Sequence, residues 1–95
     1  MLAPDGSYKT TDMALATVLT MCGYEPTMEK VGREVEFIVA TDVVDGYMEQ
    51  IVDDYVRGAY RVEPKRFVRE LRAVRKDVYR LMDHDGAKRG TKLNR

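Results

Sequence analysis

The stretch EVEFIVA, at residues 34–40, decides what kind of fold this chain can form. Its side chains alternate, because Val35, Phe37 and Val39 fall on one side of an extended strand and the glutamates between them fall on the other. That alternation predicts a β-strand with one buried face. Such a strand needs a partner strand and an apolar cover, so the neighbouring segments have to supply both.

The segment before this strand predicts a second, weaker strand from Tyr24 to Lys30. Pro26 lacks the N–H that a β-ladder uses, so this strand should lie at a sheet edge. Val31 and Gly32 are expected to form the turn of a two-stranded antiparallel hairpin. Because a hairpin alone is marginal in water, it should pack on helices or pair across a dimer.

The first of three expected helices covers MALATVLTMC, at residues 13–22. Residues 1–7 should form a loose arm before it, Thr10 or Thr11 should cap its N-terminus, and Gly23 should end it. Its apolar side chains cover most of the circumference, which predicts a central helix that is buried on more than one side.

The second helix is expected from a cap at Thr41 or Asp42 to about residue 57, where Gly58 follows. The third should run from Pro64 to about residue 82 and end near Gly86. We therefore expect an α+β fold in the order α-β-β-α-α, with a two-stranded antiparallel hairpin packed on three helices. One domain should span residues 1–86, followed by a flexible basic tail over residues 87–95.

Charge is divided unevenly along the chain. Residues 1–56 hold three basic side chains against eleven acidic ones, whereas residues 57–95 hold thirteen basic against five acidic. The total of zero therefore hides two parts with net charges of −8 and +8. Such asymmetry indicates an anionic partner or self-association.

The third helix arranges its cations in a stripe. At 100° per residue, its apolar side chains fall inside an arc of about 100°. Five cations lie within an arc of about 80° on the opposite side of the helix: Lys65, Arg69, Arg72, Lys76 and Arg80. Four pairs of like-charged neighbours in this set each cost about 0.2–0.5 kcal/mol, so the stripe is more stable against an anion. Tyr79, near its edge, could stack on a base.

Several anions could meet this stripe. Nucleic-acid phosphate is the leading one, since the tail adds Lys88, Arg89, Lys92 and Arg95. The acidic positions of the second helix, Asp45, Glu49 and Asp53, could instead pair with the stripe within the chain or across a dimer. The third alternative is an acidic patch on another protein. The fourth is that the stripe is a solvated face without a partner.

Other motifs do not predict chemistry. Asp83, His84 and Asp85 resemble metal ligands, but no further ligand follows at a suitable spacing. The acidic side chains of the second helix fit its solvated side, and Cys22 fits a small buried residue. No phosphate-binding loop or dinucleotide motif is present in the sequence. We expect no enzyme, no catalytic residue, no metal site and no cofactor.

Location follows from composition. A single cysteine excludes an internal disulfide, and the start, MLAPDGSYKTTD, lacks the basic and apolar regions of a signal peptide. The longest apolar stretch, around Ala14 to Cys22, is far shorter than the roughly 20 residues that span a bilayer. We expect a cytoplasmic protein without membrane contact. Its 95 residues make only a thin core, which favours a homodimer.

Five segments in order also resemble a small domain family of unknown function from bacteria, phages and other mobile elements. They are YKTTD (8–12), GREVEFIV (32–39), DYVRG (54–58), VEPKRF (62–67) and VY (78–79). The resemblance implies an α-β-β-α-α layout and an accessory role, without catalytic residues to transfer. The leading hypothesis is therefore a non-enzymatic accessory protein that binds nucleic-acid backbone independently of sequence, with a protein-binding adaptor or inhibitor of a host complex as the alternative.

Overall fold

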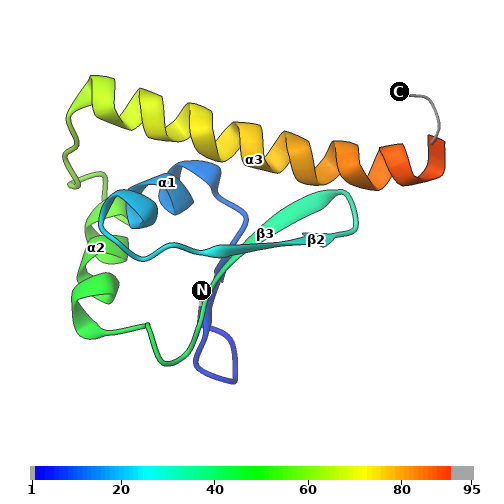
Figure 1. Cartoon of the computed structure of the whole chain (residues 1–95). Coiled ribbons are helices and arrows are strands. Elements are labelled where there is room, and N and C mark those ends of the chain that lie inside the picture. The colour runs from blue at the N-terminus through cyan, green and yellow to red at the C-terminus, as the bar shows by residue number, and fades with distance from the viewer. Residues whose placement is uncertain (1, 91–95) are drawn as a thin grey trace.

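The computed structural model describes the backbone of residues 2–90 and the side chains of residues 2–83. Over these residues it forms a three-stranded antiparallel sheet and three helices. In chain order the elements are β1 (Tyr8–Thr10), α1 (Met13–Met21), β2 (Thr27–Val31), β3 (Glu34–Val39), α2 (Gly46–Val56) and α3 (Pro64–Gly90). Figure 1 shows α3 lying along one side, with α1 beneath it and α2 at one end of the sheet. The expected α+β class is confirmed.

The expectation of a two-stranded sheet is wrong. A third strand, β1, pairs with β3 from Tyr8 opposite Val39 to Thr10 opposite Phe37, so the sheet order is β1-β3-β2. The element order is therefore β-α-β-β-α-α. Three residues are too short to show a period in the sequence, yet β3 has two edges whose backbone groups need partners. The strand expected from Tyr24 to Lys30 runs instead from Thr27 to Val31, so Pro26 precedes it, and its expected place at a sheet edge is confirmed.

The hairpin turn and the end of the third helix also differ from expectation. Val31 pairs with Glu34, so the hairpin turn consists of Gly32 and Arg33 and does not include Val31. α3 continues to Gly90 and does not end near residue 86. A single glycine inside a helix costs only about 1 kcal/mol relative to alanine, which is too little to end a long helix by itself.

The expected helix ends at Gly23 and Gly58 are confirmed. Gly23 has a positive φ of 94°, and the N–H of Tyr24 beyond it donates to the carbonyl of Leu19 at 2.9 Å. α2 ends in the same way at Gly58, whose φ is 74°, where the N–H of Ala59 donates to the carbonyl of Asp54 at 2.7 Å. A left-handed residue at this position suits glycine, because glycine has no Cβ to clash.

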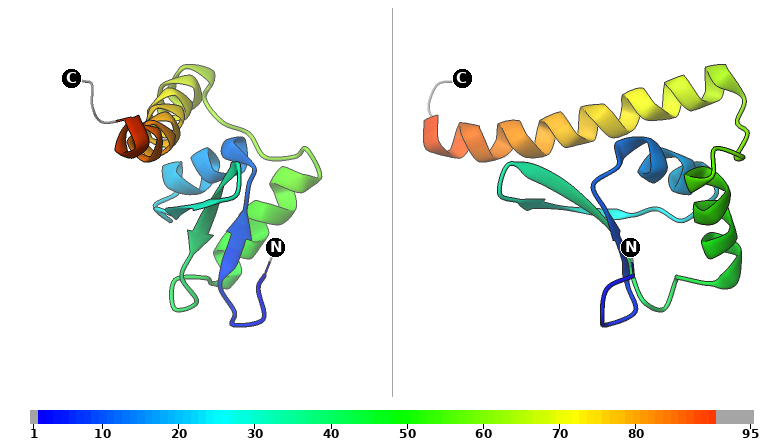
Figure 2. Two further views of the ribbon diagram at one scale, coloured as in Figure 1. Left: turned by 90° about the vertical axis from the view of Figure 1, so that its right-hand side faces the viewer. Right: turned by 180° about the vertical axis from the view of Figure 1, so that it is seen from behind.

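α1 is the central helix that the sequence predicts. Leu15, Val18 and Leu19 belong to a core cluster with α2 and the end of β3, whereas Ala16 belongs to a second cluster with Phe37 and α3. Both views of Figure 2 show α3 as an outer layer with α1 beneath it. The helix is buried on several sides because the two clusters meet on it.

The N-cap of α1 is Asp12, and the expectation of Thr10 or Thr11 is wrong. The Asp12 carboxylate accepts from the N–H of Leu15 at 3.1 Å and from the hydroxyl of Tyr55 in α2 at 2.8 Å. Thr10 has a different role, since its Oγ1 accepts from the N–H of Asp12 at 3.0 Å. Burial, together with the bond to Asp12 and its charge, raises the pKa of Tyr55 to about 12.

The N-cap of α2 is Asp45, and the expectation of Thr41 or Asp42 is wrong. Asp45 accepts from the N–H of Met48 and from the hydroxyl of Tyr24, both at 2.8 Å. These bonds hold the pKa of Asp45 below its ordinary value, the bond from Met48 contributing most. Each cap of α1 and α2 thus also binds a tyrosine at or just beyond the far end of the other helix, which ties the two helices together at both ends.

Replacing Asp12 by alanine is expected to lower the free energy of unfolding by about 1–3 kcal/mol. The loss combines a helix cap, worth about 1 kcal/mol, with the acceptor of the Tyr55 hydroxyl, worth about 0.5–1.5 kcal/mol. Urea unfolding measures it. Asp42→Ala is the matched control and should change stability by less than about 0.5 kcal/mol, since Asp42 is exposed and caps nothing. Equal stability of the two variants would contradict the capping role of Asp12.

Candidate nucleic-acid interface

The orientation of α3 begins at its first turn. Glu63 precedes Pro64, and its carboxylate accepts from the backbone N–H groups of Lys65 at 3.0 Å and Arg66 at 2.9 Å. A carboxylate at this position satisfies donors that have no partner inside the helix and suits the helix dipole. The expectation that Pro64 opens the third helix is confirmed.

The inner face of α3 anchors the helix on the core. Val78 is buried against Phe37 of β3, and the half-buried Val74 and Leu81 pack on the same cluster. Phe67 reaches the other cluster, next to α1 and α2. The apolar arc expected from the sequence therefore faces inward at these positions, so the opposite side of the helix faces outward.

The outward side carries the basic stripe, which we define as Lys65, Arg69, Arg72, Lys76 and Arg80. All five side chains are exposed. From the first to the last, the stripe extends about 22 Å along one straight helix (Figure 2). The structure thus brings these expected site residues onto one continuous surface.

Four of the five stripe cations make no ion pair with any residue whose side chain is described. Arg80 does, to Asp77 one turn earlier at 3.2 Å, and both side chains are largely exposed. A surface pair of this kind is worth little. The repulsion between the remaining neighbours along the stripe is therefore not relieved within the described part of the chain.

The acidic positions of α2 do not meet the stripe within the chain. Asp45 caps its own helix, and no ion pair joins Glu49 or Asp53 to a described residue of α3. The stripe points away from the core, whereas α2 packs on the far side of α1 (Figure 1). The intrachain version of this pairing is therefore wrong, and its version across a dimer stays a prediction.

A second acidic surface lies on the outer face of the sheet. Glu29 of β2 stands opposite Glu36 of β3, and Glu34 lies on the same face. Their neighbours Val35 and Phe37 face the core and α3, so this surface and the basic stripe point in opposite directions. The alternation of the sequence already places Glu34 and Glu36 on one side of the strand, whereas the position of Glu29 beside them follows only from the pairing of β2 with β3.

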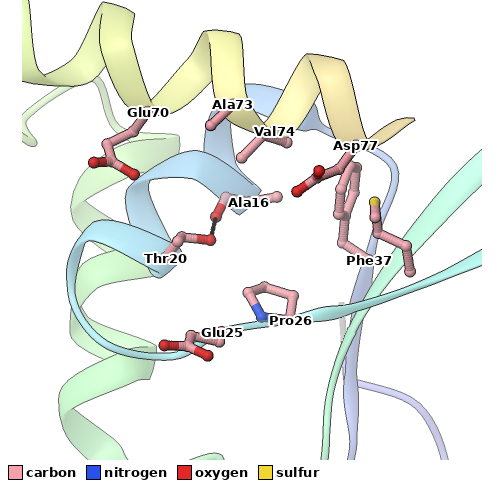
Figure 3. A pocket seen from close by; sticks show the side chains of 10 residues that line it. Ala16, Thr20, Glu25, Pro26, Phe37, Glu70, Ala73, Val74 and Asp77 are labelled. Carbon is pink, nitrogen blue, oxygen red and sulfur yellow. Dashed lines mark hydrogen bonds between the residues drawn. The ribbon is translucent and has the colours of Figure 1, made fainter. Parts of the chain in front are cut away.

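A groove between α1, α3 and the segment leading into β2 is also lined by acidic side chains (Figure 3). Its volume is about 260 Å³, and Phe37 and Val74 are among the residues that line it. Glu25, Glu70 and Asp77 stand around it. These carboxylates disfavour an anion in the groove, so the groove is not suited to phosphate.

The four tail cations cannot be placed with the stripe. Lys88 and Arg89 belong to α3 by their backbone, but their side chains lie outside the described ones. Lys92 and Arg95 lie outside the described residues altogether. Their part in binding stays a prediction.

Other chemistry has little geometric support in the described part of the chain. No group of three His, Cys, Asp or Glu side chains described here could hold a metal ion. The Cys22 sulfur lies 3.0 Å from the Tyr60 hydroxyl, and this hydrogen bond, with burial, raises the pKa of Tyr60 to about 12.

Among the helices over residues 2–90, none combines the length and apolarity needed to cross a bilayer.

The fold and surface therefore define a small α+β domain with a basic helix on one side and acidic surfaces elsewhere. Comparison with models of protein families, with curated proteins and with solved structures finds no match to this chain. The resemblance to a family of bacteria, phages and mobile elements stays a prediction.

Proposed function

We propose that this chain is a non-enzymatic accessory protein that binds the backbone of nucleic acid through the basic stripe, extended by the tail cations. The observation that carries the proposal is the row of exposed stripe cations without acidic partners among the described side chains, except at Arg80. A ligand with regularly spaced negative charges relieves the repulsion along this row. The acidic sheet face on the other side favours approach of such a ligand from the α3 side.

Binding of this kind is independent of sequence. Phosphate contacts position a protein on nucleic acid but read no bases, and lysine and arginine on one exposed helix face suit phosphate. Following the composition and the thin core, the proposal also places the protein in the cytoplasm as a homodimer. Following the resemblance of the sequence, it derives the protein from a phage or another mobile element.

The first test is fluorescence anisotropy of labelled single- and double-stranded DNA and RNA, titrated with the full chain at several salt concentrations. We expect micromolar binding at low salt that weakens with a log–log slope of about −3 to −5, as five phosphate contacts require. Counterions released from the phosphates produce this slope. Absence of binding at low salt would contradict the proposal.

The second candidate is a protein-binding adaptor or inhibitor that acts on a host complex through α2. The observation in its favour is that α2 exposes Tyr47 at 65% and Val56 at 72%, near the acidic Glu49 and Asp53. Exposed aromatic side chains are enriched at protein interfaces. An adaptor of this kind would keep its partner when the basic stripe is neutralised, whereas nucleic-acid binding would not survive.

A further inference from the structure

A second row of side chains runs beside the basic stripe on α3. Val68, Arg75 and Tyr79 recur at seven and four residues, which places them within an arc of about 40° along one line of the helix. We call these three residues the outer row. Arg72 of the stripe lies about 20° from Tyr79 around the helix, so the row and the stripe are adjacent and parallel.

The outer row is open in the structure. Tyr79 is 60% exposed and Val68 is 43% exposed. Arg75 is exposed and makes no ion pair with a described side chain, and the Tyr79 hydroxyl makes no hydrogen bond with one. The inner face of α3 already supplies the packing of the helix, so core formation does not explain why Val68 and Tyr79 lie on the outside.

We infer that the nucleic acid bound by this chain is single-stranded, with its phosphates on the basic stripe and its bases on the outer row. This inference rests on the proposed function and names its ligand class. Phosphates and unpaired bases form two parallel tracks along a single strand, as the two rows of side chains do on α3. Tyrosine rings and arginine guanidinium planes stack on unpaired bases, and every base offers the necessary face.

A duplex fits the same surface less well. Its bases are stacked inside the helix and present only their edges in the grooves, so Tyr79 would have no base face to cover. Association of two copies through Val68 and Tyr79 also fits poorly, because it would bring Arg72 and Arg75 of each copy close to those of the other.

The test compares a labelled single strand of mixed sequence with its duplex at one moderate salt concentration. We expect the full chain to bind the single strand about tenfold more tightly. Tyr79→Ala should weaken single-strand binding by about tenfold, as loss of one stacked base does, and change duplex binding by less than about twofold. The salt slope should stay the same, since no phosphate contact is lost. Tyr79→Phe should bind like the parent protein.

Tyr47→Ala is the matched control, because Tyr47 is exposed to a similar extent on α2, away from the stripe. It should leave binding unchanged. The sequence has no tryptophan, so Tyr79→Trp and Tyr47→Trp each introduce a single fluorescent reporter. We expect a single strand to quench the reporter at position 79 and not the one at position 47.

The remaining outcomes of these binding experiments distinguish the inference from the proposed function. Equal binding of strand and duplex, or full binding by Tyr79→Ala, would overturn the inference while leaving the proposed function intact. Absence of binding by the parent protein would overturn both. Sedimentation of the same variants checks the remaining case, because a dimer that Tyr79→Ala dissociates would make the outer row a contact between copies.

Discussion

Replacing Arg69, Arg72 and Lys76 together by glutamine is expected to weaken nucleic-acid binding by about 100-fold at a salt concentration of about 0.1 M. Each phosphate contact contributes about 0.7–0.9 to the log–log salt slope, which corresponds to a similar number of decades of affinity at this salt. Three lost contacts should therefore also reduce the slope by about 2. Anisotropy titrations at several salt concentrations measure both quantities.

The control for this variant changes the net charge by the same amount, but at three arginines outside the basic stripe. Arg33, Arg57 and Arg61 are exposed and lie outside the described range of α3. Their joint replacement by glutamine should weaken binding by less than about threefold, because only the general attraction of the protein falls. Equal losses in the two triple variants would mean that net charge, and not the stripe, binds the ligand.

The same stripe variant should fold at least as well as the parent protein. It removes all four like-charged neighbour pairs along the stripe, so the free energy of unfolding should rise by up to about 1–2 kcal/mol. Urea unfolding measures this change and separates lost binding from lost structure. If the variant unfolds or changes its oligomeric state, the stripe is structural, and the proposed function loses its basis.

Replacing Leu19 by alanine is expected to lower the free energy of unfolding by about 3–5 kcal/mol. Leu19 is fully buried in α1, and removal of its side chain loses apolar burial and leaves a cavity. A domain of this size has a total stability of about 5–15 kcal/mol, so the variant should be close to unfolding at room temperature.

Leu2→Ala provides the matched control, because Leu2 is 51% exposed. It should change stability by less than about 0.5 kcal/mol in the same urea experiment. A cost below about 1 kcal/mol for Leu19→Ala would contradict the position of α1 between the two core clusters. Retained nucleic-acid binding by Leu2→Ala would show that the Leu2 side chain does not contribute to the interface.

The helices and the stripe could be predicted because their signals are local. Gly23 and Gly58 end their helices through a backbone conformation that glycine adopts easily, and Pro64 opens α3 through its fixed φ. The stripe follows from helical periodicity alone, once α3 has been recognised. Each of these features depends on residues within a few positions of one another.

The missed features depend on residues far apart in the chain. β1 forms because β3 offers a second edge, and its three residues have no period of their own. Asp45 caps α2 in preference to Asp42 at a place where the Tyr24 hydroxyl also reaches it, across 21 positions of sequence. Local preference for a cap cannot distinguish two nearby aspartates when a distant partner contributes to the choice.

Sequence alone therefore determined the α+β class, the alternating strand and the five cations on one side of a helix, because periodicity places side chains on faces. Tertiary structure decided where those faces point. Packing of Val78 against Phe37 turns the stripe outward, and the pairing of β2 with β3 gathers Glu29 and Glu36 on the opposite side. The acidic and basic side chains occupy adjacent halves of the sequence, but in the folded chain the sheet glutamates and the basic stripe lie on opposite surfaces. The reason is that burial of the apolar faces leaves each charged face directed to solvent.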